Sequence, residues 1–160
     1  MQLRLFADYF QVCILDGQSA AGLVEVWTPE SLADRVAISG DSLTVRTEVN
    51  VDVEVNVGWT ATPPVLDVNL FDHVVEVSLE IASGEMVIMG CTDYSPDAFR
   101  MKVWPGWVRL RIQKSNLKNA VLADLESDES PETIERIRID AWPEKPSSLR
   151  VMKRWQGVGG

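Results

Sequence analysis

Apolar and polar residues alternate along most of the chain, which is the pattern of strands that are buried on one face. The clearest segment is 48–57, where five valines alternate with Glu48, Asn50, Asp52, Glu54 and Asn56. A helix would spread those valines around its circumference, whereas an extended chain places them all on one face. Valine is β-branched and packs well on a pleated surface. We therefore predict a strand with one face towards solvent.

The same alternation predicts about nine strands in all. The other candidates are the ranges 3–5, 10–14, 43–45, 75–81, 86–89, 99–103, 108–112 and 137–141. One short helix is predicted after Thr28, because threonine is a good N-cap and Pro29 suits the first helical position. Regular turn signals, without alternating strands and helices, favour an all-β fold: an antiparallel β-sandwich of about nine strands with one short helix. An open barrel is compatible with the same pattern.

Two turn motifs separate neighbouring strand patterns. Ser83-Gly84 has the short glycine-containing spacing that is typical of a β-hairpin. In Trp104-Pro105-Gly106-Trp107, proline and glycine fit the central positions of a type II turn, and the twist of that turn predicts a wider connection. Residues 116–120 and 124–132 are predicted to form a long acidic loop, because they are polar and rich in serine.

The length of 160 residues fits one domain, which we place at 1–155 with a flexible tail at 156–160. No apolar run approaches the roughly 18 residues that are needed to cross a bilayer. The N-terminal stretch is interrupted by Arg4 and Asp8, which is not typical of a signal peptide. The chain is therefore expected in the cytoplasm, with no membrane partner.

Residue types that carry most catalytic and metal chemistry are scarce. The two cysteines, Cys13 and Cys91, lie in apolar surroundings and are expected to be free thiols in a reducing compartment, although a disulfide between them is also open. The single histidine, His73, lies at the start of a predicted strand, where a hydrogen-bonded or solvated ring is commoner than a catalytic base. There is no glycine-rich phosphate loop and no Cys-x-x-Cys pair. We predict no enzyme activity, no catalytic residue, no metal and no cofactor.

Charge is segregated along the sequence. The chain has 15 Lys and Arg against 24 Asp and Glu, and the net charge of −9 disfavours nucleic acid as a direct partner. The span 47–99 holds ten acids and no Lys or Arg, whereas 100–118 holds six basic residues and no acid. This reversal has either a structural or a functional explanation.

Both explanations remain open from the sequence. If acidic and basic strands are neighbours in one sheet, their outward charges form cross-strand pairs of about 0.2–1 kcal/mol each. If the acidic strands form one negative surface, that surface attracts a basic protein, such as a protein built to hold nucleic acid. In the second case the predicted partner-binding residues are Asp52, Glu54, Asp67, Asp72, Glu76 and Glu80.

Six tryptophans favour an alternative function, a β-sandwich module that binds a carbohydrate or another small ligand. Trp104 and Trp107 flank the predicted turn and are the candidate platform. Such a pair more often packs across its own hairpin. A homodimer through an exposed edge strand is also open.

Several short segments resemble one known family. They are Tyr9-Phe10-Gln11-Val12 with Asp16, Trp27-Thr28-Pro29-Glu30, the range 77–88, and the range 103–110. In these segments and their order the chain resembles the competence protein ComJ family, inhibitors of a DNA-entry nuclease. The resemblance implies a bacterial, immunity-like protein that inhibits or neutralises a nuclease. The acidic loop near Asp128 and the tail around Trp155 depart from the family pattern, and no functional residue carries over.

Overall fold

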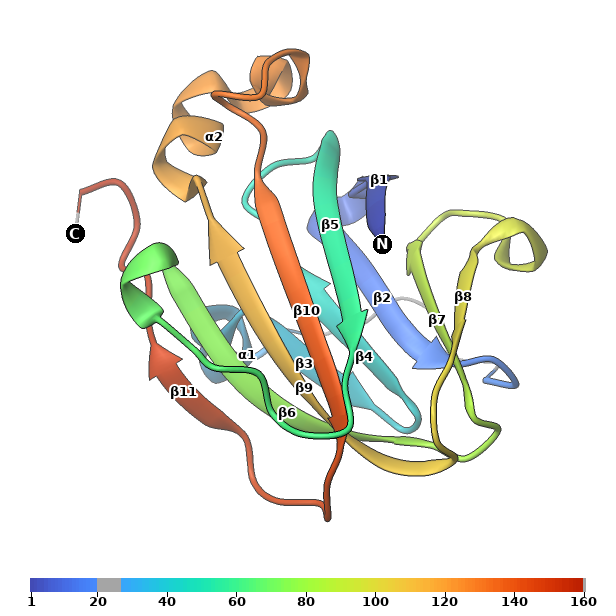
Figure 1. Cartoon of the computed structure of the whole chain (residues 1–160). Helices are drawn as coiled ribbons and strands as arrows, with labels where there is room; N and C mark the ends of the chain where they lie inside the picture. The colour runs from blue at the N-terminus through green and yellow to red at the C-terminus, as the bar shows by residue number, and fades with distance from the viewer. Residues whose placement is uncertain (20–26, 160) are drawn as a thin grey trace.

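The computed structural model describes residues 1–19 and 27–159 and shows two β-sheets (Figure 1). The six-stranded sheet contains, in spatial order, β1 (Gln2–Phe6), β5 (Asp52–Trp59), β10 (Arg136–Pro143), β9 (Gly106–Ser115), β6 (His73–Ile81) and β11 (Arg150–Lys153). The five-stranded sheet contains β3 (Val36–Ser39), β4 (Ser42–Arg46), β2 (Gln11–Asp16), β7 (Glu85–Gly90) and β8 (Phe99–Lys102). Neighbouring strands are antiparallel except β5 and β10, which are parallel.

The alternating apolar positions of both sheets meet in one core. On the larger sheet, Val53 and Val55 of β5 are fully buried, and Ile14 and Leu43 approach from the smaller sheet. Segment 60–72 passes over the outer face of the larger sheet (Figure 1), where the Pro64 carbonyl accepts a hydrogen bond of 2.8 Å from Arg111. All of β6 except Glu80 is buried. The all-β prediction is therefore confirmed, but the described residues contain eleven strands rather than nine, and the larger sheet is mixed.

In residues 1–19 and 27–159, helical structure is limited to short segments between the strands. These are α1 (Pro29–Asp34), α2 (Leu117–Ala123) and the 3₁₀ turns η1 (Asp8–Phe10), η2 (Val68–Leu70), η3 (Ser95–Asp97) and η4 (Asp124–Glu129). The predicted cap of α1 is confirmed, since Thr28 Oγ1 accepts the N–H of Ser31 at 3.0 Å. The expectation of a loop at 116–120 was wrong. The first N–H of α2 is capped by Asp72 from a distant segment, a contact that the local pattern does not contain.

The predicted hairpin at Ser83-Gly84 was also wrong. Strand β6 pairs with β9 and β11, whereas β7 pairs with β2 and β8, so this turn carries the chain from the larger sheet to the smaller one. The connection from β8 to β9 carries it back, and the two connections lie side by side (Figure 1). The N–H of Val103 donates to the Gly84 carbonyl at 2.9 Å. Each turn thus joins two sheets instead of two paired strands.

Asp16 fixes the first of these crossovers. Its carboxylate is buried and accepts the backbone N–H groups of Ser83 and Gln18, each at 2.8 Å. Burial alone would raise the pKa of Asp16, but these hydrogen bonds outweigh it and hold the pKa below the ordinary value. The carboxylate is therefore held in its charged form at the junction between the sheets.

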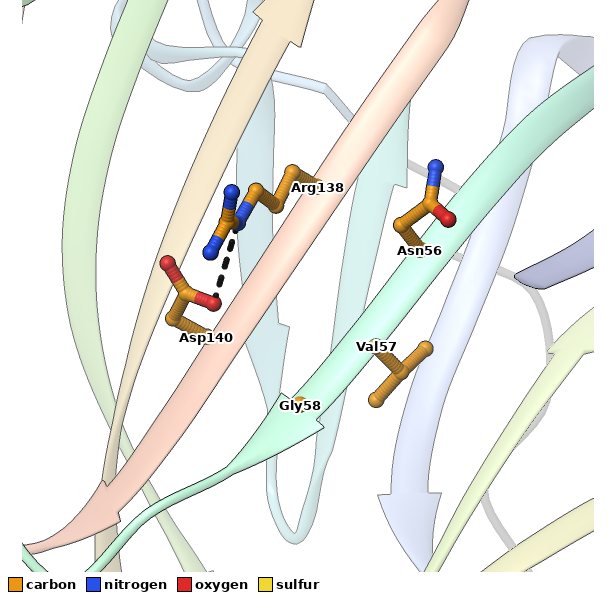
Figure 2. A pocket seen from close by; sticks show the side chains of 5 residues that line it. All are labelled: Asn56, Val57, Gly58, Arg138 and Asp140. Carbon is orange, nitrogen blue, oxygen red and sulfur yellow. Dashed lines mark hydrogen bonds and ion pairs between the residues drawn. The ribbon is translucent and has the colours of Figure 1, made fainter. Parts of the chain in front are cut away.

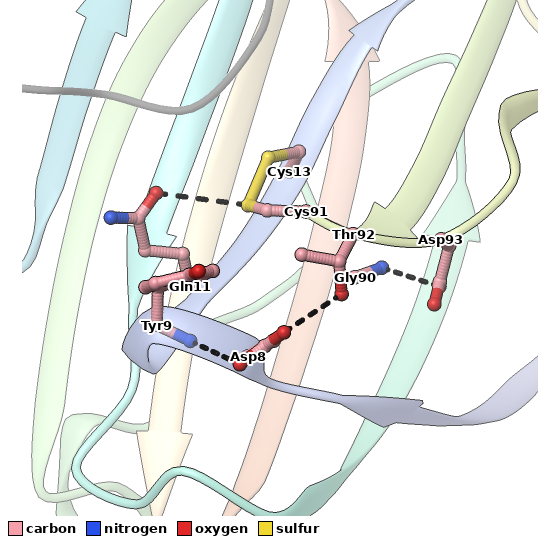
Figure 3. Close-up of a disulfide and its surroundings, with 8 residues drawn as sticks. All are labelled: Asp8, Tyr9, Gln11, Cys13, Gly90, Cys91, Thr92 and Asp93. Carbon is pink, nitrogen blue, oxygen red and sulfur yellow. Dashed lines mark hydrogen bonds between the residues drawn. A yellow bond between two sulfur atoms is a disulfide. The ribbon is translucent and has the colours of Figure 1, made fainter.

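Cys13 and Cys91 form a disulfide (Figure 3), so the expectation of two free thiols was wrong. Their Cα atoms are 5.7 Å apart, because β2 and β7 are antiparallel neighbours and Cys91 directly follows β7. Disulfides persist mainly in oxidising compartments, which is at odds with the expected cytoplasmic location.

Among the helices of the described residues, none has the length and apolar character needed to span a bilayer.

Candidate functional site

The predicted acidic residues do not gather into one negative face. Strands β5 and β6 lie in the same sheet, but β10 and β9 lie between them. Three strand spacings separate the two acidic strands by roughly 14 Å. The intervening strands carry outward arginines, including Arg136 on β10 and Arg109 and Arg111 on β9. Arginines of β10 and β9 therefore separate the acidic residues of β5 from those of β6.

Three of the six predicted residues form cross-strand ion pairs. Asp52 lies 2.9 Å from Arg4 of β1. Glu54 lies 3.6 Å from Arg136 of β10. Glu76 is buried and lies 2.9 Å from Arg111 and 3.8 Å from Arg109. For these three carboxylates, cross-strand pairing with basic residues of the same sheet accounts for the charge pattern.

The other three predicted residues have different surroundings. Asp67 accepts the N–H of Asn69 at 3.0 Å and so caps η2. Asp72 caps α2. Glu80 is exposed, and no ion pair to it is found in the described parts of the chain. Contact of any of the six with a partner stays a prediction.

A buried charged cluster lies where β9 ends. Lys114 is fully buried, and its Nζ donates to the Arg46 carbonyl at 2.7 Å. The same ammonium lies 3.3 Å from Glu48 and 3.2 Å from Glu135 Oε1, the latter without hydrogen-bond geometry. Burial raises the pKa of Glu135. Burial opposes ionisation of Glu48 too, but Lys114 and Arg35 outweigh it and lower the pKa of that carboxyl.

His73 packs beside this cluster and has no nitrogen free for acid–base chemistry. Its Nε2 donates to the Asp34 carbonyl at 2.8 Å, and its Nδ1 accepts the N–H of Trp155 at 3.2 Å. Burial, with a further contribution from the Lys114 charge, lowers the pKa of His73 to about 4. The ring thus joins the C-terminal segment to the end of α1 as a neutral group.

Sequence reasoning missed this cluster, although a signal for it exists. Lys114 is two residues after Ile112 and four after Leu110, so the alternation of a strand places all three on the inward face. Glu135 has the same relation to Ile137. In the described residues, no group of three His, Cys, Asp or Glu side chains could hold a metal ion.

A shallow cavity of about 300 Å³ lies on the outer face between β5 and β10 (Figure 2). Gly58 lines it beside Asp140, and a Cβ at this position would lie 3.7 Å from Asp140 Oδ1. The polar groups that line it already have partners: Asp140 accepts hydrogen bonds from Arg138 at 3.2 Å and from Gln113 at 2.8 Å. The cavity therefore offers few unpaired groups to a substrate.

The predicted tryptophan platform is partly formed. Trp104 is 58 % exposed and Trp107 is 42 % exposed. The Trp104 ring packs edge-on against Trp59 of β5, with ring centroids 6.1 Å apart. An exposed aromatic surface therefore exists at this end of the larger sheet, and its binding of a ligand stays a prediction.

Three adjoining cavities follow the edge strand β1, and we call them together the β1 groove. Their volumes are about 440, 350 and 140 Å³, and Arg4 lines all three. The largest lies between Leu3 and Leu5 of β1 and Phe99 of β8. Five carboxylates line the groove, namely Glu54, Asp93, Asp97, Asp128 and Glu129.

The β1 groove is an apolar depression with a negative rim. Arg4 is the one cation among the residues that line these three cavities. Its guanidinium is already engaged by Asp52 at 2.9 Å and by the Asp128 carbonyl at 2.6 Å. The groove therefore combines apolar side chains with carboxylates that favour a cationic ligand. It is the best candidate site in the described structure.

Comparison with known proteins finds likeness in structure alone. No protein-family model and no curated protein sequence matches the chain. The crystal structure of ComJ from Bacillus subtilis, described as the inhibitor of the DNA-degrading activity of NucA, matches with a TM-score of 0.68 and 14 % identity over 90 % of this chain and 96 % of that one. A protein described as crocagin biosynthetic gene J matches with a TM-score of 0.58 and 18 % identity over 91 % and 96 % of the two chains. At these identities the comparisons show that the chain has a ComJ-like fold.

Proposed function

We propose that the protein is a non-enzymatic binding protein that inhibits a nuclease with a basic surface, in an immunity-like role. The observation that supports this most directly is the ComJ-like fold, which extends over 90 % of the chain. The net charge of −9 agrees with a cationic protein as partner and disfavours direct binding of nucleic acid.

The physical basis of such inhibition is occlusion. A nuclease holds a polyanion, so its DNA-binding surface is positive. Carboxylates on an inhibitor can occupy that surface and speed the encounter of the two proteins. Because Glu54 and Glu76 are already paired with arginines, Asp93 and Asp97 of the β1 groove are a better source of such carboxylates than the centre of the sheet.

The test has a capture step and an activity step. Immobilised protein is used to capture partners from cells that express it naturally, and the captured fraction is assayed for DNA cleavage. Adding free protein should reduce the cleavage rate in proportion to its amount, until an equimolar complex is reached. Excess DNA should not restore cleavage, since the proposed target is the nuclease and not its substrate. A captured partner without nuclease activity, or a nuclease that the protein leaves fully active, overturns the proposal.

The second candidate function is binding of a small ligand, with carbohydrate as the leading class. The observation that favours it is the exposed pair Trp104 and Trp107, with Trp104 held against Trp59. Titration of sugars with tryptophan fluorescence as the readout tests this function. A response that is lost in Trp104→Ala would support it, and no response to any sugar would count against it.

A further inference from the structure

Among the described residues, strand β1 has a neighbouring strand on one side only, so its other edge is unpaired. Met1 and Val57 exchange backbone hydrogen bonds of 3.0 and 2.9 Å, and the N–H of Ala7 donates to the Val51 carbonyl at 3.1 Å. In an antiparallel pair, residues that are bonded in this way alternate with residues whose N–H and C=O groups point away from the partner strand. Gln2 and Arg4 therefore point their backbone groups outward, on the side where β1 has no neighbouring strand.

The apolar part of the β1 groove lies beside this edge. Leu3 and Leu5 face the core side of β1 but are only partly buried, because β1 is the last strand of its sheet. Phe99 of β8 lies across the 440 Å³ cavity from them. Strand β8 is likewise an edge strand of the smaller sheet. The open side of the molecule thus presents apolar side chains next to unpaired backbone groups.

The rim of the same cavity is acidic. Asp93 and Asp97 lie on the connection between β7 and β8, and neither forms an ion pair in the part of the chain that the structure describes. Asp93 accepts the N–H of Gly90 at 2.8 Å, which fixes its carboxylate in place. Since the cation of the groove, Arg4, is engaged by Asp52, the charges that remain available are negative.

We propose that β1 accepts an extended basic segment of the protein partner as an added strand. The backbone of that segment hydrogen-bonds to Gln2 and Arg4, an apolar side chain enters the cavity between Leu3 and Phe99, and lysine or arginine side chains lie against Asp93 and Asp97. Strand addition of this kind derives affinity from main-chain hydrogen bonds and specificity from side-chain pockets. The assignment of the segment to a protein partner rests on the proposed function.

The first test measures amide exchange with a defined probe. The probe is an acetylated and amidated peptide of sequence Lys-Val-Lys-Phe-Lys-Val-Lys, and the control peptide has glutamate in place of each lysine. The lysine peptide should slow hydrogen exchange at the amides of Gln2 and Arg4, while the glutamate peptide should not. Equal exchange at both amides with and without the lysine peptide overturns the inference.

A pair of variants isolates the backbone contact. Arg4→Pro and Arg4→Ala both remove the ion pair with Asp52, but only the proline variant removes the outward N–H, and proline is tolerated at such edge positions. The lysine peptide should bind Arg4→Pro about threefold to tenfold more weakly than Arg4→Ala, which corresponds to one backbone hydrogen bond. Thermal unfolding of both variants shows whether they fold equally well. Equal affinity of two folded variants for the peptide contradicts strand addition.

A second pair of variants isolates the acidic rim. Asp93→Asn with Asp97→Asn removes two charges at the groove, and the asparagine oxygen can still accept the Gly90 N–H. The matched control, Asp67→Asn with Glu80→Gln, removes two charges elsewhere. The groove variant should weaken peptide binding about threefold to tenfold at low salt, and the control less than about twofold. An equal effect of both variants assigns the attraction to net charge and overturns the role of the rim.

The inference and the proposed function fail separately. If a nuclease is inhibited but its complex leaves the Gln2 and Arg4 amides unprotected, the β1 edge is not the site and the function stands. If the peptide protects both amides but no nuclease is inhibited, the edge is a strand-binding site and the proposed function is wrong.

Discussion

At the scale of single residues, the main feature is a set of ionisable groups in inward strand positions. Lys114, Glu135 and His73 are fully buried: Lys114 lies 3.2 Å from Glu135 and 3.3 Å from Glu48, and His73 is its neighbour across β6 and β9. Removing a charge from water is costly, so such groups persist only with close partners. Arg35 extends the cluster to the C-terminal segment, because its guanidinium bonds to Glu48 and lies 5.2 Å from the centre of the Trp155 ring.

Replacing Lys114 should destabilise the fold strongly. Lys114→Met keeps most of the side-chain volume but leaves Glu48 and Glu135 without the ammonium between them. Breaking a buried ion pair from one side typically costs about 3–5 kcal/mol of unfolding free energy. Urea denaturation measures the loss, and Lys118→Met is the exposed control, with an expected change within about 0.5 kcal/mol. A loss no larger than that of the control would show that the cluster contributes nothing to stability.

His73 should make the fold sensitive to mild acid. Its pKa is lowered from 6.5 to about 4 in the folded state, so the unfolded chain takes up the proton first as pH falls. Stability is complete above about pH 6.5 and declines towards pH 4, by an amount of order 3 kcal/mol at 1.36 kcal/mol per pKa unit. Urea denaturation between pH 7 and pH 4 should show this slope in the native protein and a flatter one in His73→Gln. Equal slopes would mean that another group titrates in this window.

At the scale of elements, the strands with long alternation were predictable, whereas two of the edge strands, β3 and β11, were not. β5, β9 and β10 lie inside the larger sheet, where one face must be apolar along the whole strand. β3 and β11 are edge strands with one neighbour each, so a few residues suffice and the pattern is short. Local turn chemistry located the bend at Gly84 but not the change of sheet, because strand pairing depends on contacts with distant segments.

The two crossovers between the sheets should tolerate little change. At Gly84 an added Cβ would lie 2.9 Å from Pro105 Cγ, whereas at Gly40 it would meet nothing within 4 Å. Both glycines have positive φ, so Gly84→Ala and Gly40→Ala share the conformational cost of alanine. Gly84→Ala should lower the unfolding free energy by a further 1–3 kcal/mol or so, because the crossovers are forced apart. Equal losses of unfolding free energy in the two variants, measured by thermal or urea unfolding, would show that Pro105 moves aside without cost.

The disulfide should stabilise the smaller sheet and its connection to β8. It joins residues separated by 78 positions, and closing a loop of that size typically stabilises a fold by about 2–5 kcal/mol. Cys13→Ala with Cys91→Ala should lower the unfolding free energy by about that amount, and dithiothreitol should produce a similar loss in the native protein but none in the double variant. Thiol labelling of the denatured, unreduced protein should find no free thiol. Two labelled thiols would restore the expectation of free cysteines.

At the scale of the whole molecule, strand order decides what the charge pattern means. The acidic span 47–99 is continuous in sequence, but β10 and β9 enter between β5 and β6 and bring arginines with them. The sequence therefore predicted that acidic and basic residues lie on the outer face, but not which of them pair with one another. The β1 groove was not predictable for the same reason, since its walls come from β1, the β7–β8 connection and η4, which are remote along the chain.

The excess of negative charge should appear in the kinetics of partner binding rather than in the stability of the sheet. The exposed cross-strand pairs are screened by salt and contribute little each, so raising NaCl from 50 to 500 mM should change the unfolding temperature only slightly. The association rate with a basic nuclease should fall about tenfold or more over that range, while the dissociation rate should change less, because long-range attraction acts on the encounter. Stopped-flow mixing measures both rates, and an association rate that is independent of salt would mean that the partner is recognised by apolar contact and backbone pairing alone.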